Sequence, residues 1–448
     1  MEFTNTLYTN DNLFILNGLN SNLVDLIYLD PPFNSKRFYS APIGSKAAGA
    51  NFKDIWFWKD VNEEYLNTLA EKYPALTDFI ASAGAVHSKA MMAYLTYIAQ
   101  RIIEMHRILK DTGSLYLHCD TTASHYLKAL LDEIFGKDNF KNEIVWERTT
   151  DTGSSKSVAN RYPTNTDIIL FYTKSADRYT FNKQYYEYSN KYILNKFNNN
   201  DKDGRGAYRW QVLKSYSQET FDKLKNENML KKTDSSKYYY YKQYLNEGKG
   251  VIISNLWDAE DVVPLGPSSK ERTGYPTQKP LALLKRIIEA SSNEGDIVLD
   301  PFCGCATTCV AAQQLGRKWI GIDIAEQAVD ILVERLSDDA GIFKDFINTS
   351  AIPQRTDIQR VEPVKSVKER LYKEQNGLCN ACGTYFDIWN LEIDHIIPKS
   401  KGGGDYYENY QLLCSHCNKM KSDNPMESLR LKIETRKKML KDKIIFGE

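Results

Sequence analysis

A net charge, a long apolar run and an export signal are all missing from this sequence. Its 448 residues include 58 Lys and Arg and 58 Asp and Glu, a balance that argues against an indiscriminate coat for nucleic acid. No stretch reaches the ~18 apolar residues that a membrane helix needs. The amino terminus, MEFTNTLYTNDN, has neither a basic flank nor an apolar run. We therefore expect no membrane partner and a cytoplasmic location.

The eight cysteines fall into two groups. Four lie in apolar or glycine-rich surroundings that are typical of small packing residues: Cys119, Cys303, Cys305 and Cys309. The others form two CxxC pairs near the carboxyl terminus, CNAC and CSHC, with 31 residues between them. In a cytosolic protein such pairs are typical of metal ligands rather than disulfides, and four thiolates predict a closed structural zinc site. The expected zinc ligands are Cys379, Cys382, Cys414 and Cys417.

Apolar runs alternate with segments of helical period through most of the chain. The run at 22–33, NLVDLIYLDPPF, is typical of a buried parallel strand that stops at a double proline. Residues 88–110 keep a helical apolar period that ends in a basic turn before Asp111-Thr112-Gly113. Such alternation predicts an α/β fold with a mostly parallel sheet. Further strands are expected at 114–120, 142–148, 166–174, 296–300 and 318–324, and further helices at 122–135, 278–291 and 306–316.

The composition changes between residues 175 and 270. Residues 174–250 carry 16 Lys and Arg against 9 Asp and Glu, together with twelve tyrosines. Because cations neutralise phosphates and aromatic rings stack on bases, this composition favours a nucleic-acid recognition region; half-buried packing tyrosines are the alternative. Residues 350–366 carry two prolines and no periodicity, which predicts a linker. The expected parts of the chain are 1–174, 175–270, 271–349, the linker 350–366 and 367–448.

The segment DIVLDPFCGCATT at 296–308 joins a strand that ends in Asp300 to a turn of small residues. Small residues let the backbone approach a ligand beyond the carboxyl end of a strand. Asp323 ends the next strand, where an acid is the usual partner of ribose hydroxyls. A small adenosyl ligand fits better than a dinucleotide, because the turn has one glycine where GxGxxG has three. A structural turn without a ligand is the alternative.

The tetrad DPPF at 30–33 points to the chemistry. Two prolines fix the backbone beyond the strand, so that the Asp30 carboxylate and the Pro31 carbonyl can aim at one point. Two acceptors suit an exocyclic amine, whose two N–H groups both need partners. Phe33 offers a flat apolar face to a base that has left the duplex. The alternative is an ordinary turn at the end of a strand.

Together, DPPF and DPFCGCATT resemble the amino-methylating DNA methyltransferases, over about residues 1–345. The tetrad precedes the cofactor turn with a basic region between them, an order that resembles the circularly permuted β group. The resemblance implies a Rossmann-like methyltransferase sheet with an inserted DNA-recognition region, S-adenosylmethionine as cofactor and double-stranded DNA as partner. It assigns the target amino group to Asp30, Pro31, Pro32 and Phe33. It assigns the cofactor to residues of TNDN, YPTQKP, the glycine turn and WIGIDI, namely Asp11, Lys279, Pro280, Asp300, Pro301, Phe302, Gly304, Thr307 and Asp323.

Two details of the resemblance bear on the reaction. Ala306 stands in place of the second glycine of FxGxG, and alanine excludes some left-handed backbone geometry, so we expect a slightly shifted turn. Asp30 and Phe33-Asn34 favour adenine, with N6-methyladenine as product, because the cytosine-amino enzymes more often carry Ser first and Tyr-Trp last. Cytosine N4 methylation is the alternative, and the sequence leaves open a homodimer.

Between the two CxxC pairs lies LEIDHIIPKSKGGGDYYENYQLL, which resembles the HNH (ββα-metal) nucleases over about 368–424. The resemblance makes His395 the general base, and Asp394 and Asn418 the ligands of magnesium or manganese; Asn409 orients the loop. Phosphodiester hydrolysis needs such a base and cation. A nuclease beside a methyltransferase suggests restriction and modification in one chain, joined by a coil that spans roughly 20–25 Å. A zinc module that only binds DNA is the alternative.

Overall fold

The fold comes from a computed structural model of the chain. Within the residues that it describes, no helix is both long and apolar enough to cross a bilayer. The structure describes residues 5–33, 37–41, 45, 51–54, 69–70, 72–149, 160–234, 236–266, 268–325, 327–338, 346–358, 363–424, 426, 428–430, 432–433 and 435. Asn34, one of the residues that favoured adenine, lies outside these ranges.

A nine-stranded sheet forms the centre of the chain. Eight of its strands run parallel, and β7 is antiparallel to both of its neighbours. The predicted α/β class with a mostly parallel sheet is therefore confirmed. In spatial order the strands are β13 (Leu256–Trp257), β6 (Phe140–Glu147), β7 (Thr166–Thr173), β5 (Leu109–Cys119), β2 (Val24–Leu29), β14 (Ile297–Asp300), β15 (Lys318–Asp323), β1 (Thr6–Thr9) and β16 (Ile347–Thr349).

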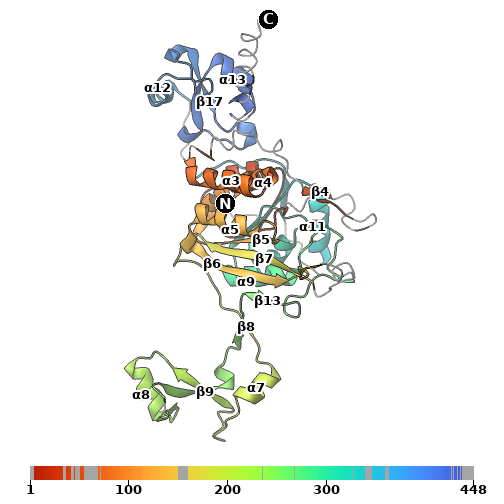
Figure 1. Cartoon of the computed structure of the whole chain (residues 1–448), viewed down its shortest axis with the longest axis vertical. Helices are drawn as coiled ribbons and strands as arrows, with labels where there is room; N and C mark the ends of the chain where they lie inside the picture. The colour runs from red at the N-terminus through yellow and green to blue at the C-terminus, as the bar shows by residue number, and fades with distance from the viewer. Residues whose placement is uncertain are drawn as a thin grey trace. The chain divides into compact units, whose positions relative to one another are not determined.

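Helices cover both faces of this sheet. One face carries α1 (Asn12–Gly18), α3 (Pro74–Val86), α4 (Lys89–Ile108) and α5 (Ser124–Phe135); the last three lie together beside the strands in Figure 1. The other face carries α9 (Leu281–Ser291) and α10 (Thr307–Gln314), which is followed by α11 (Gln327–Asp338). The helical period predicted for 88–110 becomes α4, which buries Ile98, Ile102 and Met105 completely. Each such side chain stabilises the fold by roughly 1.5–3 kcal/mol.

The boundary between α4 and β5 differs from the sequence-based expectation. The helix was expected to run to residue 110 and the strand to begin at 114, but β5 begins at Leu109 and includes Asp111-Thr112-Gly113. The strand accommodates them through an irregularity in its pairing with β2, because Val24 pairs with Leu109 whereas Leu26 already pairs with Ser114. Such bulges let extra residues enter a strand without ending it.

Residues 183–254 form a separate compact unit within the basic segment. Its small core holds Tyr208, Met229 and Tyr244, so two of the twelve tyrosines are packing residues. Others are exposed, including Tyr216 and Tyr238. The unit contains β8 (Tyr185–Tyr186), α7 (Asn190–Lys196), β9 (Tyr208–Leu213), α8 (Gln218–Asn226), β10 (Leu230–Lys231), β11 (Tyr239–Tyr244), η3 (Leu245–Glu247) and β12 (Val251–Ile252).

The carboxyl-terminal part has a ββα arrangement. Strands β17 (Leu391–His395) and β18 (Tyr410–Cys414) pair antiparallel, and α13 (Ser415–Lys421) follows directly. Helix α12 (Lys365–Glu374) packs on β18, and the predicted ββα fold is confirmed. The remaining elements of the chain are β3 (Arg37–Ser40) paired with β4 (Asn51–Asp54), and the short 3₁₀ helices η2 (Lys137–Asn139), η4 (Ile388–Asn390), η5 (Lys399–Lys401) and η6 (Tyr407–Asn409).

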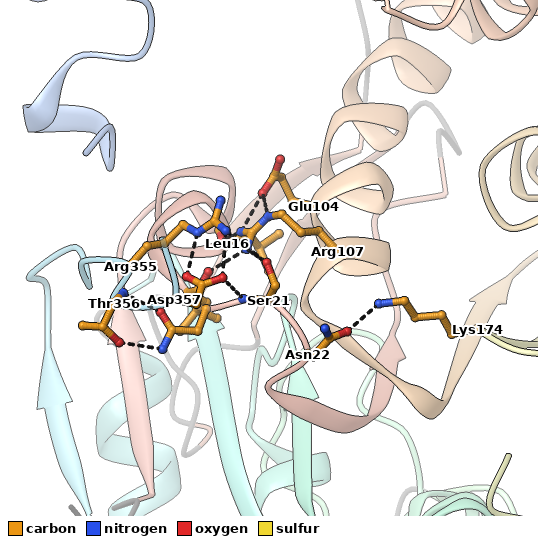
Figure 2. A network of polar contacts seen from close by, with 11 residues as sticks. Leu16, Ser21, Asn22, Glu104, Arg107, Lys174, Arg355, Thr356 and Asp357 are labelled. Atoms are coloured by element: carbon orange, nitrogen blue, oxygen red, sulfur yellow. Dashed lines mark hydrogen bonds and ion pairs between the residues drawn. The ribbon is translucent and has the colours of Figure 1, made fainter. Parts of the chain in front are cut away.

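The first half of the predicted linker is bound to the sheet unit. Residues 350–357, which we name the docked strap, lie along α1 and the turn after it (Figure 2). Thr356 and Asn20 exchange two hydrogen bonds of 2.8 and 2.9 Å, and the Ser21 amide donates to Asp357 at 3.0 Å. A Cβ at Gly18 would lie 1.9 Å from the Pro353 carbonyl oxygen, so only glycine permits this approach. The free coil expected over 350–366 is therefore wrong for 350–357.

Two arginines lie at this contact, one in the docked strap and one on α4. Arg355 donates to Ser21 and pairs with Asp357, and this guanidinium lowers the pKa of the Asp357 carboxyl. From α4, Arg107 donates to the carbonyls of Leu16 and Leu19 at the end of α1 and pairs with Glu104 (Figure 2). Backbone carbonyls at the carboxyl end of α1 thus accept hydrogen bonds from a cation, which is favourable at a helix end.

Candidate active site

A cavity of about 220 Å³ opens at one edge of the central sheet. Its walls come from the turns after β1, β2, β14 and β15, and from residues 275–279. Parallel strands end at the same edge, which is where open α/β sheets bind ligands. All four residues of DPPF line the cavity, as does every residue assigned to the cofactor except Pro280, which is the N-cap of α9. Target and cofactor candidates therefore share one space.

The turn after β14 is fixed by its first residue, Asp300. This buried carboxylate accepts hydrogen bonds from the Phe302 amide and the Thr308 hydroxyl, so it ties the start of the turn to the start of α10. Burial raises the pKa of Asp300 to about 7, against the opposing effect of these two hydrogen bonds. Asp300 therefore shapes the turn rather than presenting a full charge to a ligand.

Two residues of the same turn adopt left-handed backbone conformations. Gly304 has φ +49°, and a Cβ there would lie 2.9 Å from the Tyr275 ring. Ala306 has φ 56° and ψ 30°, and it is fully buried. The alanine therefore takes the left-handed conformation that was expected to be disfavoured, at roughly 1–2 kcal/mol of strain. The surrounding packing therefore holds the alanine in a conformation that glycine adopts without strain.

The acid after β15 is anchored to the turn. Asp323 accepts hydrogen bonds of 2.8 Å from the amides of Gly304 and Ala325. Burial raises the pKa of Asp323, and these amide donors oppose the rise. The next side chain, Ile324, is 77% exposed and lines the cavity, so it offers an apolar face beside the carboxylate. An acid next to an apolar face suits a ribose joined to a base.

The start of α1 adds a second acidic position to the cavity. Asp11 is the N-cap of α1 and accepts from the Leu13 amide at 2.8 Å. Arg101 of α4 pairs with Asp11 at 3.1 Å and donates to Asn12 at 2.6 Å, and Asn12 donates to the Pro301 carbonyl. This chain of bonds links the turns after β1 and β14, which are 289 residues apart in sequence.

Asp30, the first residue of DPPF, has its two carboxylate oxygens in different situations. Oδ2 forms an ion pair with Lys279, whose side chain is 9% exposed. Oδ1 is buried and has no hydrogen-bond partner among the described residues. A buried acceptor without a partner costs free energy, so this oxygen can gain free energy by accepting an N–H from a ligand. Lys279 also lies 5.4 Å from the centre of the Phe33 ring, so this lysine, assigned by sequence to the cofactor, borders the target side of the cavity.

The four predicted zinc ligands come together in the carboxyl-terminal part. The sulfur atoms of Cys379, Cys382, Cys414 and Cys417 lie within 4.8 Å of one another. Tetrahedral zinc with bonds of 2.3 Å needs sulfur atoms about 3.8 Å apart, so the cluster fits the metal. The Cys414 amide donates to the Cys379 sulfur at 3.2 Å, as amides do to thiolates. Burial opposes ionisation of Cys382, but hydrogen bonds from Thr384 outweigh it and lower the pKa of this thiol to about 7.

The HNH residues lie around the end of β17. His395 Nε2 is 2.9 Å from Asp405 Oδ1, which gives the imidazole a carboxylate partner. Asn409 is buried. Its side-chain N–H donates to the Ile397 carbonyl and its side-chain oxygen accepts from the Ile397 amide, so it closes the glycine loop. Asp394 and Asn418, the two expected metal ligands, each form polar contacts with other side chains. Asp394 accepts from Lys421 and Gln411, and Asn418 donates to Glu392 at 2.6 Å.

The sequence analysis did not single out several residues that form contacts around the two sites. Arg101 could have been predicted, because it interrupts the apolar stripe of α4 between Tyr97 and Met105. An unpaired cation there would be costly, so an acidic partner was to be expected. Lys421 follows Asn418 by three residues and so shares its helix face. Asp405 gave no signal, because its role depends on how the glycine loop folds back on His395.

A family model described as DNA methylase matches residues 24–334, and one described as HNH endonuclease matches residues 379–424. The type II methyltransferase M.EcaI of Enterobacter cloacae is 29% identical over 77% of this chain and 72% of its own length. The DNA adenine methyltransferase YhdJ of Escherichia coli K12 is 28% identical over 74% of this chain and 82% of its own. The crystal structure of the M1.HpyAVI-SAM complex aligns over 74% of this chain and 98% of its own, with 19% identity and a TM-score of 0.38.

Proposed function

Because the chain belongs to the DNA methylase family, we propose that it transfers the methyl group of S-adenosylmethionine to the exocyclic amino group of adenine in double-stranded DNA. The observation that carries this proposal is the unpartnered Oδ1 of Asp30 in a cavity that also holds the glycine turn. A curated relative is named as a DNA adenine methyltransferase, which supports adenine over cytosine. We place the reaction in the cytoplasm.

The residues of DPPF would act on the amine. Asp30 Oδ1 accepts one N–H of the target amine, and the Pro31 carbonyl accepts the other. Both bonds draw the nitrogen toward tetrahedral geometry and free its lone pair from conjugation with the ring. Lys279 pairs with the second oxygen of Asp30 and keeps the carboxylate in place. Phe33 offers its ring face to the flipped base. A new N–C bond would form as the C–S bond breaks, the sulfur would keep the electron pair of the broken bond, and the nitrogen would release one proton to water.

The cofactor residues fit S-adenosylmethionine by their chemistry. When bound, this cofactor supplies the methyl group. Asp323 would accept the ribose hydroxyls, and Ile324 and Phe302 would cover the adenine with apolar surface. Asp11, which follows the strand next to that of Asp323, would help to hold the adenosine. With both ligands oriented in one cavity, positioning supplies most of the acceleration.

The compact unit at 183–254 is the proposed site of DNA recognition. Its exposed lysines and tyrosines, such as Tyr216 and Tyr238, suit contacts with phosphates and sugars. Arg209 is instead held inside the unit by Gln243 and Tyr192, so it serves the packing of this surface.

The base assignment is tested on the product. Purified protein is incubated with unmethylated genomic DNA and S-adenosylmethionine, the DNA is digested to nucleosides, and the methylated base is identified by mass. We expect N6-methyladenine and no N4-methylcytosine. Methylcytosine alone would overturn the base assignment, and no methylation by protein that binds the cofactor would overturn the proposed reaction.

We also propose that the carboxyl-terminal module cleaves DNA, which would make the chain a restriction-modification fusion. The match to the HNH endonuclease model and the His395–Asp405 pair favour this second activity. Asp405 would orient the imidazole so that His395 can take a proton from water. Asp394 and Asn418 offer the oxygen ligands that magnesium and manganese prefer. The ion would balance negative charge on the phosphate.

The nuclease proposal is tested with unmethylated DNA and Mg²⁺ or Mn²⁺. The His395→Ala variant should cleave about 10²–10⁴-fold more slowly than wild type, because it lacks the general base. His416→Ala is the matched control, since this exposed histidine belongs to the same module and should leave the rate unchanged. If the wild-type chain binds this DNA but leaves it intact with either ion, the module is a binding appendage.

A further inference from the structure

A chain of buried polar groups runs behind Phe33. His118 on β5 is fully buried, with its Nδ1 3.0 Å from the Tyr28 hydroxyl and its Nε2 3.2 Å from Asp167 Oδ2. The second oxygen of Asp167 pairs with Arg148 at 3.0 Å. These residues come from β2, β5, β7 and the end of β6, all on the target side of the sheet.

The sheet does not need these groups for its stability. A histidine and a carboxylate lose their hydration when they are buried, and well-packed apolar residues of similar volume often fold as well or better. Leu115 and Leu117 fill the opposite face of β5, whereas His118 shares its face with the buried Ser114 and Tyr116. Of these three, His118 is the one whose ring stacks with Phe33 of DPPF, which gives it a place beside the site.

The partners of His118 define which nitrogen carries its proton. Burial raises the pKa of Tyr28 well above its usual range, so Tyr28 keeps its hydroxyl proton and can donate it. Burial opposes ionisation of Asp167, but His118, Lys279 and Arg148 outweigh it and lower the pKa of this carboxyl, so it is an acceptor. Nε2–H of His118 then donates to Asp167, and Nδ1 accepts from Tyr28. Both ring nitrogens of His118 are thus hydrogen-bonded.

The fixed imidazole touches the target aromatic. The rings of His118 and Phe33 are stacked, with centroids 6.0 Å apart and planes 20° apart. Trp146 meets His118 edge-on at 5.8 Å and 88°, and Tyr28 meets it at 6.3 Å and 87°. Held by two hydrogen bonds and two perpendicular rings, the imidazole has one orientation. Phe33 therefore lies nearly parallel to an imidazole whose orientation is fixed.

We propose that His118, locked by Tyr28 and Asp167, is a positioning residue that sets the plane of Phe33 and thereby of the target base. The inference rests on the proposed methyl transfer. A base that is tilted on Phe33 moves its amine away from the Asp30 and Pro31 acceptors and from the line of the breaking bond. A misplacement of about 1 Å can lower a rate about 100-fold without preventing binding.

The structure offers a matched pair of variants. Tyr28 and Tyr116 are paired across β2 and β5, and each is 2% exposed. Each hydroxyl makes one buried hydrogen bond, Tyr28 with His118 and Tyr116 with Ser291 at 2.7 Å. Tyr28→Phe and Tyr116→Phe therefore remove the same group at similar structural cost, but only the first frees His118. The kinetic constants are measured with labelled S-adenosylmethionine and unmethylated genomic DNA.

We expect Tyr28→Phe to lower kcat about tenfold and His118→Asn about 100-fold, with KM for S-adenosylmethionine changed less than about twofold. Tyr116→Phe should keep kcat within about twofold of wild type. Equal kcat values for Tyr28→Phe and Tyr116→Phe would overturn the inference. In ¹⁵N-histidine spectra at pH 7, His118 should show one protonated and one bare nitrogen; two protonated nitrogens would also overturn it. Absence of wild-type turnover would instead overturn the proposed function, and the spectra would still decide the state of His118.

Discussion

Replacing Asp30 with alanine should lower kcat for methyl transfer by about 10³-fold or more, while the affinity for S-adenosylmethionine changes less than about fivefold. The large effect is expected because Asp30 Oδ1 is the one acceptor of DPPF that is buried and left without a partner among the described residues. The small effect is expected because Asp323, Asp11 and the glycine turn are built by other elements. Turnover is measured with labelled cofactor, and affinity by calorimetry.

Loss of Asp30 also leaves Lys279 buried without its partner, which can cost about 3–5 kcal/mol of stability. The effect on turnover must be separated from this cost. Asp30→Asn keeps the volume but leaves the charge of Lys279 unpaired, whereas the double variant Asp30→Ala with Lys279→Met removes that charge. The double variant should melt close to wild type, and both variants should remain at least about 10²-fold slower. A folded Asp30→Ala protein that retains more than a tenth of the wild-type kcat would show that DPPF is only a turn.

Removing zinc should unfold the carboxyl-terminal module and leave methyl transfer intact. We expect about one zinc per chain, and a loss of the stabilisation of about 10–16 kcal/mol that structural zinc sites supply to small domains at neutral pH. The module depends on the metal because Cys379, Cys414 and Cys417 belong to its small core, which bound zinc would tie together. Metal analysis, followed by limited proteolysis after chelation, would show this loss.

The methyl-transfer activity of the chelated full chain is the internal control, since the cavity is built from residues 10–325. Cys119→Ala is the matched variant, because Cys119 is equally buried but lies in the sheet and should retain the zinc. Cys414→Ser should lose it. Protein purified without chelator and found free of zinc would reject the assignment.

The sequence predicted the parts of this protein that depend on local order. Apolar runs gave the central strands, and both DPPF and the glycine turn lie at strand ends because proline and glycine stop a ladder there. The short strands β1 and β16 at one side of the sheet were not predicted, since three or four residues carry no readable period and pair only through the sheet.

Residues that act through tertiary contacts were the hardest to predict. Lys279 was assigned with its motif to the cofactor, but its ammonium pairs with Asp30, which is 249 residues away in sequence. His118 looked like one polar residue in a strand, and its partners appear only once β2 and β7 flank β5. Ala306 shows the opposite case, in which packing imposes a backbone conformation that the residue itself disfavours.

The docked strap has a consequence for how such two-part genes exchange their modules. A crossover at codon 350 would separate Pro353 from Gly18 and Asp357 from Ser21. A foreign segment would then have to pack on a surface that fits this one. A crossover after codon 357 transfers the nuclease-like module whole and leaves the strap on its own helix. A chimera that keeps this contact intact would therefore join the HNH module after Asp357, inside the segment that the sequence predicts as a single linker.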